Sequence, residues 1–153
     1  MQIPPELLTF LNAMIPVGEL RTAIPYAIGG LGLPLWTAFW VSVAGTTTVA
    51  ILLFYLLGPA TKLLRKIPFM DRFFNWLFHR TRTKHTKKME ELGLFALFVF
   101  VMIPLPGSGA WTGTLIAYLF NIKASHALPT ISLGILASAV IVTFGTEVVI
   151  NLF

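Results

Sequence analysis

The most constraining feature of this sequence is an uninterrupted run of 23 residues, Leu35 to Leu57, without a charged side chain. As a helix it is about 34 Å long at roughly 1.5 Å per residue, enough to cross about 30 Å of bilayer hydrocarbon. Trp36 and Tyr55 lie near its ends, where aromatic side chains meet the membrane interface. We therefore predict a transmembrane helix at residues 35–57, ended by Gly58-Pro59.

A second uncharged run of 20 residues, Ala127 to Thr146, ends at Glu147 and predicts another transmembrane helix at 127–147, with Pro129 near its start. Of all 153 residues, 56% are apolar and 11% are charged. Soluble domains are about 45–50% apolar and about 25% charged, so this chain lacks the polar surface to cover its own core in water. The composition indicates a multi-pass integral membrane protein, too short to carry a separate catalytic domain.

Two other apolar regions are too irregular for simple spans. Residues 92–122 are 31 uncharged residues, about 46 Å as a helix, which is long for one crossing and short for two. Their middle, Ile103 to Gly109, holds two prolines and two glycines, which interrupt a helix. Residues 6–33 are broken in the same way, first at Pro16 and Gly18. We predict that each region forms a re-entrant hairpin of two half-helices whose broken tip faces the protein interior.

The segment 61–91 carries nine of the eleven lysines and arginines, which predicts a cytoplasmic loop under the positive-inside rule rather than nucleic-acid binding. Its apolar positions follow a helical spacing that predicts an amphipathic helix on the membrane surface. These positions are Phe69, Met70, Phe73, Phe74 and Leu77.

The order of hairpin then span occurs twice, in residues 1–60 and in residues 92–153. At a spacing of 88, Ile15-Pro16 aligns with Ile103-Pro104, and one residue later in register Gly45 aligns with Gly134. With the basic loop in the cytoplasm, the second unit must be inverted relative to the first. The predicted fold is one all-α membrane domain, residues 1–153, of two inverted repeats joined by the basic surface helix.

Glu19 and Arg21, with Pro16 and Gly18 beside them, are the first candidates for binding substrate or ions, because ionisable groups at membrane depth are costly unless they are paired or hydrated. Arg21 would hold an anionic group such as phosphate, and Glu19 a proton or a cation. The structural alternative is an ion pair, or an Arg21 that donates to hairpin carbonyls. The broken tip beside them favours a functional role.

The second broken tip supplies exposed N–H groups, hydroxyls and an indole, and the half-helix that starts near Ala110 points its positive end at the tip. An anion would be favoured there, although the same residues would also permit close packing. The candidates are Pro104, Pro106, Gly107, Ser108, Gly109, Trp111, Thr112 and Gly113.

Neither catalysis nor a cofactor is indicated. The chain has no cysteine, which excludes disulfides and thiolate metal sites, and its three histidines are dispersed, so no metal site is predicted.

The stretches Ile15 to Pro25 and Pro104 to Gly113 together resemble the small multidrug export protein family, which is similar to the DedA, or SNARE-associated (VTT), superfamily. The resemblance covers nearly the whole chain. It implies two opposed re-entrant hairpins and transport of lipids, polyprenyl-phosphate carriers included, with proton coupling. Glu19 and Arg21 would be the acidic and basic groups of the first hairpin. DedA proteins carry an arginine motif in the second hairpin, whereas here that hairpin has no charge.

We therefore expect a secondary transporter or lipid translocase, moving an amphipathic, lipid-phosphate type of substrate between the two hairpins in a prokaryotic-type cytoplasmic membrane. Membrane lipids are the expected partners, nucleic acid is not, and a homo-oligomer is compatible with the sequence. Two alternatives stay open: a drug/proton antiporter, and a membrane scaffold that transports nothing.

Overall fold

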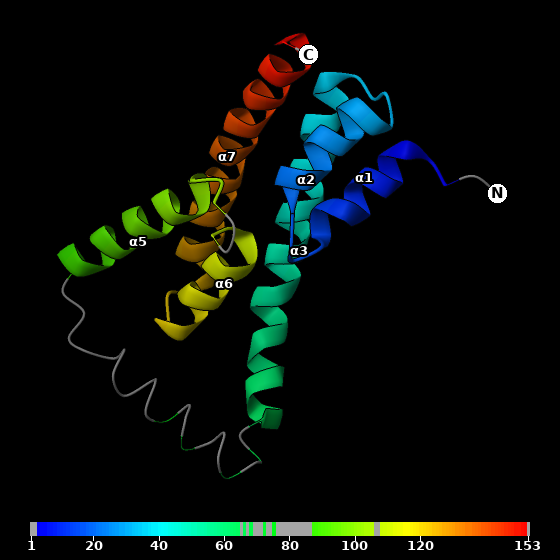
Figure 1. Cartoon of the computed structure of the whole chain (residues 1–153). Helices are drawn as coiled ribbons and strands as arrows, with labels where there is room; N and C mark the ends of the chain where they lie inside the picture. The colour runs from blue at the N-terminus through cyan, green and yellow to red at the C-terminus, as the bar shows by residue number, and fades with distance from the viewer. Residues whose placement is uncertain are drawn as a thin grey trace.

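The computed structural model describes residues 3–64, 66, 68, 72, 75, 87–105 and 108–152. Within these ranges every regular element is a helix (Figure 1). The amphipathic helix predicted around Phe69 to Leu77, and the tip residues Pro106 and Gly107, lie outside the described residues.

Two long helices, α3 (Leu35–Leu64) and α7 (Ala124–Leu152), are the longest elements. Their 30 and 29 residues correspond to about 45 Å each, and both are apolar enough to cross a membrane. The two long apolar helices predicted from the sequence are therefore confirmed. Figure 1 shows that α3 descends from the top of the molecule while α7 ascends to the C-terminus beside the start of α3.

Both long helices exceed their predicted ends. The prediction that Gly58-Pro59 ends the first helix is wrong, since α3 continues to Leu64 with Pro59 inside it. Pro59 leaves the helix one N–H short, but the next turn is held by Thr61. Its hydroxyl lies 2.8 Å from the Leu57 carbonyl oxygen and 2.8 Å from the Tyr118 hydroxyl, which ties this turn to another helix.

The two irregular apolar regions form pairs of shorter helices. The first region contains α1 (Pro5–Met14), α2 (Leu20–Pro25) and a π-helical turn, η1 (Tyr26–Gly30). The second contains α5 (Lys87–Met102) and α6 (Ala110–Leu119). The interruptions fall where proline and glycine predict them, between α1 and α2 and between α5 and α6.

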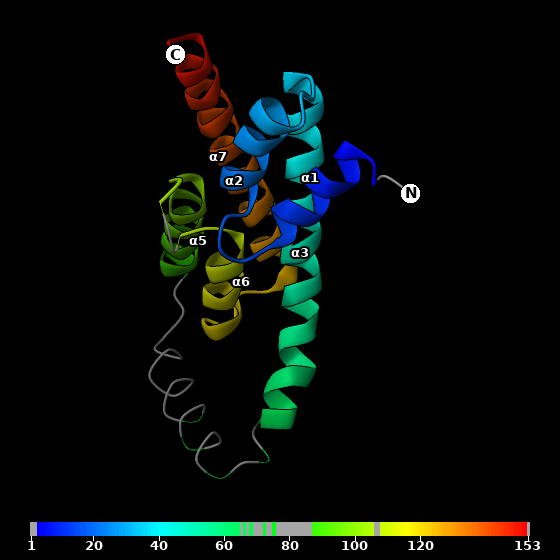
Figure 2. The same cartoon turned by 45° about the vertical axis from the view of Figure 1, so that its right-hand side comes forward.

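The helices pack in a crossed pattern (Figures 1 and 2). Helix α1 packs mainly on α3, and α5 on α7, whereas α2 also contacts α7 and α6 also contacts α3. Glycines permit the closest approaches: a Cβ on Gly45 of α3 would lie 2.5 Å from the Phe10 carbonyl oxygen, and one on Gly134 of α7 would lie 2.8 Å from Val101 Cβ. This packing brings both helix breaks to the middle of the molecule, where the candidate site lies.

Candidate functional site

Glu19 lies at the break between α1 and α2, as the residue that precedes the first turn of α2. Its backbone has φ 52° and ψ −144°, a region that favours glycine, so a glutamate is strained there. The side chain is only 6% exposed. A strained, buried acid is retained where its side chain makes contacts that no relaxed conformation would provide.

The Glu19 carboxylate binds the N-terminus of α6. Its Oε2 accepts the N–H of Ala110 at 3.1 Å, and its Oε1 accepts the N–H of Trp111 at 3.1 Å. Gly109, which caps α6, offers no side chain for these N–H groups, and a helix N-terminus favours negative charge. The sequence leaves open an anion site or close packing at this helix end, and the anion found there is the protein's own carboxylate.

Gly109 is required by this close approach. A Cβ at this position would lie 2.6 Å from Glu19 Oε2 and 2.9 Å from Oε1, closer than real Cβ atoms come. Any larger residue would displace the carboxylate or the helix end.

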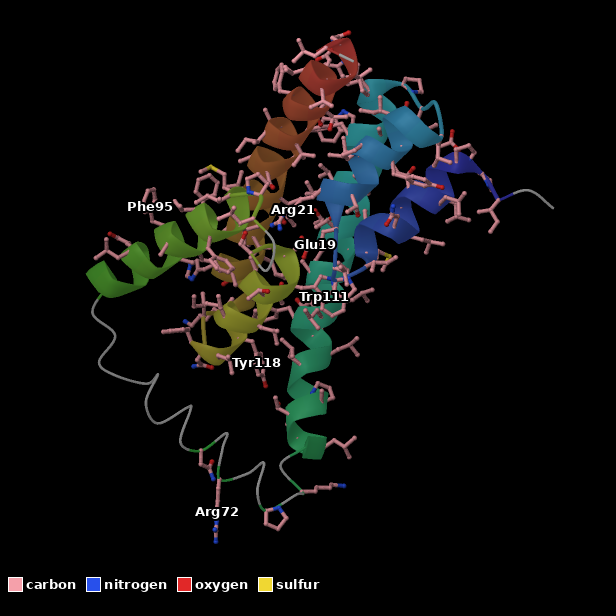
Figure 3. The ribbon with its side chains drawn as sticks, viewed as in Figure 1. Glu19, Arg21, Arg72, Phe95, Trp111 and Tyr118 are labelled. Carbon is pink, nitrogen blue, oxygen red and sulfur yellow. The ribbon has the colours of Figure 1, made fainter. Side chains whose placement is uncertain are left out.

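The break between α1 and α2 is called the first break, and the one between α5 and α6 the second. Arg21, in the first turn of α2, also binds the second break. Its guanidinium donates to the carbonyl oxygens of Leu105 and Ser108, and Nη2 lies 3.3 Å from the Ser108 hydroxyl. Ser108 in turn donates back to the Ile103 carbonyl at 2.7 Å, which holds the loop in shape. Figure 3 shows Glu19 and Arg21 at the start of α2, beside α6 and the end of α5.

Trp111 makes the reciprocal contact from the second break to the first. Its indole N–H donates at 3.1 Å to the carbonyl oxygen of Met14, the last residue of α1. The C-terminal end of α1 thereby gains a donor for one of its unpaired carbonyls. The Trp111 side chain thus takes part in packing the two breaks together.

The structure gathers most of the predicted site residues around one small cavity of about 20 Å³, room for a single water molecule. Gly109 and Trp111 adjoin it through Glu19. Gly113 faces elsewhere, since a Cβ there would meet Val101 of α5 at 2.5 Å. Pro104 lies in the loop after α5, half-buried, and is not among the cavity residues. The cavity is lined by Pro16, Val17, Gly18, Glu19, Arg21, Ser108 and Thr112.

Sequence reasoning misses the backbone partners in this site, the carbonyls of Met14 and Leu105 and the N–H of Ala110. The identity of an apolar side chain does not indicate which hydrogen bonds the main-chain atoms of its residue make. The one usable signal is Gly109, because a helix that begins after a glycine needs an acceptor for its N–H groups from elsewhere. Among the described residues no cluster of three histidine or acidic side chains could hold a metal ion.

The family model described as "Putative small multi-drug export protein" matches residues 19–141. No curated protein and no solved structure matches the chain. The matched region begins at Glu19 and includes Arg21, the second break and most of both long helices. The match covers well over half of the sequence, together with the contacts of Glu19 and Arg21 with the second break. The chain therefore belongs to the small multi-drug export protein family.

Proposed function

We propose that this protein is a membrane secondary transporter whose substrate passes between the two helix breaks, at the junction of Glu19 and Arg21 with the second break. The observation that carries the proposal is the reciprocal binding across this junction. Each charged side chain of the first break binds backbone groups of the second, at the place where the two halves of the chain meet.

The proposed membrane position rests on the surface of the long helices. Large apolar side chains are exposed along both, among them Trp36, Tyr55, Phe144 and Val148. On a protein in water so much exposed apolar surface would be a liability, whereas lipid is its natural solvent. Both breaks would then lie at membrane depth, where backbone groups need partners within the protein, and Glu19 and Arg21 supply such partners to the second break.

An inverted repeat is supported by equivalent contacts in the two halves. Gly45 of α3 packs on the Phe10 carbonyl of α1, and Gly134 of α7 packs near the Phe98 carbonyl of α5. The two phenylalanines are 88 residues apart and the two glycines 89, the registers at which the halves align by sequence. The crossed contacts, α2 with α7 and α6 with α3, repeat in the same way. Inverted repeats with broken helices at the midplane are typical of secondary transporters.

The proposed substrate class is an amphipathic anion of the lipid-phosphate type, as the resemblance to DedA proteins implies. An anionic group would replace the Glu19 carboxylate at the N–H groups of Ala110 and Trp111, where the helix end favours negative charge. Arg21 would exchange the Leu105 carbonyl for a phosphate oxygen.

Proton coupling would follow from the same geometry. Charge-assisted hydrogen bonds are roughly twice as strong as neutral ones, so protonation of Glu19 would weaken its hold on α6 and release the junction. Return of the proton would close it again. Glu19 would thus be protonated while the substrate occupies the helix end.

Reconstitution into liposomes tests this function. Purified protein is screened with fluorescent phospholipids, polyprenyl phosphates and cationic dyes, each with and without a pH gradient, against protein-free liposomes. Movement of a lipid phosphate supports the proposal. Movement of dyes alone would indicate a drug/proton antiporter, and the absence of any flux from an inserted, monodisperse protein would favour a scaffold.

A further inference from the structure

A second cavity, of about 350 Å³, lies between the start of α3 and the C-terminal half of α7. This volume falls in the range of small-molecule sites, and the cavity shares no lining residue with the one at Glu19. Its walls are mostly apolar and aromatic. It is lined by Leu35, Trp36, Phe39, Val140, Thr143, Phe144 and Glu147.

Thr143 is the first sign that this cavity takes a ligand. The residue is only 6% exposed, and among the described residues its hydroxyl has no hydrogen-bond partner. Thr130 and Thr146 of the same helix each donate at 2.8 Å to the carbonyl four residues back, a bond that Thr143 does not make. A buried hydroxyl without a partner is rare, and this one belongs to a residue in the wall of the cavity.

Glu147 determines the sign of charge that the site favours in a ligand. It lies one helical turn beyond Thr143, on the same face of α7, so both residues border the cavity. The side chain is exposed, and within the described part of the chain no ion pair satisfies it.

Aromatic rings complete the site. Trp36 and Phe39 pack edge to face with their centroids 6.2 Å apart, and Phe144 faces the cavity from α7. The faces of aromatic rings carry negative potential and attract organic cations. The polar and aromatic walls therefore favour the same sign of charge in the ligand.

We propose that this cavity binds an amphipathic organic cation, with a protonated amine held by Glu147 and Thr143 and an apolar body against the aromatic rings. A lipid acyl chain would leave the hydroxyl and the carboxylate unsatisfied, and an anion would be repelled by Glu147. The site stands on α3 and α7 alone and requires no transport through the Glu19 junction.

Calorimetric titration of the full-length protein in a neutral maltoside detergent tests this site with a matched pair of probes. The cation is 2-(1-naphthyl)ethylammonium, and the control is its uncharged N-acetyl derivative. We expect saturable binding of the amine and at least about tenfold weaker binding of the amide, because a charged hydrogen bond at the carboxylate is lost.

Three variants locate the binding. Glu147→Gln should weaken binding of the amine by about tenfold or more. Glu6 is an exposed acid on α1, and Glu6→Gln should leave the affinity for the amine unchanged. Thr143→Val keeps the shape of the side chain and removes the hydroxyl, so it should weaken binding of the amine by a few fold, as the loss of one hydrogen bond does. If Glu147→Gln does not fold, the amide probe and Thr143→Val still decide.

Equal binding of amine and amide would overturn the proposal, as would full affinity in a folded Glu147→Gln protein. Nanodiscs separate a free amine from a lipid headgroup. Binding of the amine is measured in nanodiscs of phosphatidylglycerol and in nanodiscs of phosphatidylethanolamine. Equal binding in the two lipids supports the proposal. If phosphatidylethanolamine abolishes it, the site belongs to the lipid ammonium and the proposal fails.

Discussion

The Glu19 carboxylate accepts the N–H of Trp111 at 3.1 Å, although 92 residues separate them in the chain. The Trp111 indole returns the contact by donating to the carbonyl of Met14, on the other side of the first break. Each break thus supplies what the other lacks: an anion for a helix N-terminus and a donor for a helix C-terminus. The junction can open only when other groups take over these bonds.

Replacing Gly109 with alanine should disrupt the junction without removing any charge. The new Cβ would lie 2.6 Å from Glu19 Oε2, so the carboxylate or α6 must move. Overpacking of this kind costs about 1–3 kcal/mol, which we expect as a lower melting temperature in detergent.

Gly93→Ala is the matched control for Gly109→Ala. A Cβ at Gly93, within α5, meets nothing within 4 Å, so alanine should leave stability unchanged or raise it by up to about 1 kcal/mol. If the two alanine variants melt alike, Gly109 does not serve the close approach of Glu19.

The glycine contacts between helices predict a second pair of effects. Gly45→Ala and Gly134→Ala should each cost about 1–3 kcal/mol, because a Cβ would meet Phe10 O at 2.5 Å or Val101 Cβ at 2.8 Å. Gly145→Ala, which faces open space, should cost nothing. The melting temperatures of the three variants are compared. If Gly134→Ala lowers the melting temperature and Gly45→Ala does not, the packing in the two halves is not equivalent.

Most of the helical architecture could be predicted from the sequence, because apolar runs and helix breakers are local signals. The two long helices and both breaks follow from uncharged length and from the positions of proline and glycine. The end of α3 could not be predicted. Its helix continues past Pro59, and the turn beyond it is bonded through Thr61 to Tyr118, 57 residues away, a partner that no local pattern predicts.

Most members of the candidate site were predictable from the sequence, but their bonding partners were not. Glu19 and Arg21 stand out because charge is rare in apolar segments, and the anion-favouring end of α6 follows from helix electrostatics. That these groups would bind each other's breaks was not evident, since the partners are main-chain atoms. The structural alternative for Arg21, donation to hairpin carbonyls, describes the contacts that the structure shows.

The predicted cytoplasmic position of residues 62–91, with one transmembrane helix on each side of them, would place both termini outside. Because the chain has no cysteine, Gln2→Cys and His85→Cys each introduce a single thiol. An impermeant thiol reagent added to whole cells should label position 2 and leave position 85 unlabelled until the cells are lysed. The reverse pattern would be incompatible with the inverted arrangement.

Glu19→Gln should uncouple transport from the pH gradient while substrate still binds. Glutamine keeps the size of the side chain but cannot gain and lose a proton, and its neutral oxygen holds α6 less strongly. Flux is measured against an imposed gradient, with Glu6→Gln as the control acid. An unchanged response in Glu19→Gln would remove the proton role from this residue and leave it a structural one.

Transport by Arg21 variants tests the central claim most directly. Flux of a lipid phosphate that the wild type moves is measured in liposomes holding Arg21→Ala or Arg21→Lys, each verified as inserted and monodisperse. We predict that alanine abolishes flux and that lysine retains part of it, since an ammonium cannot reproduce the planar fork of a guanidinium. Wild-type flux in Arg21→Ala, with only a lower melting temperature, would contradict the account and make Arg21 a structural residue.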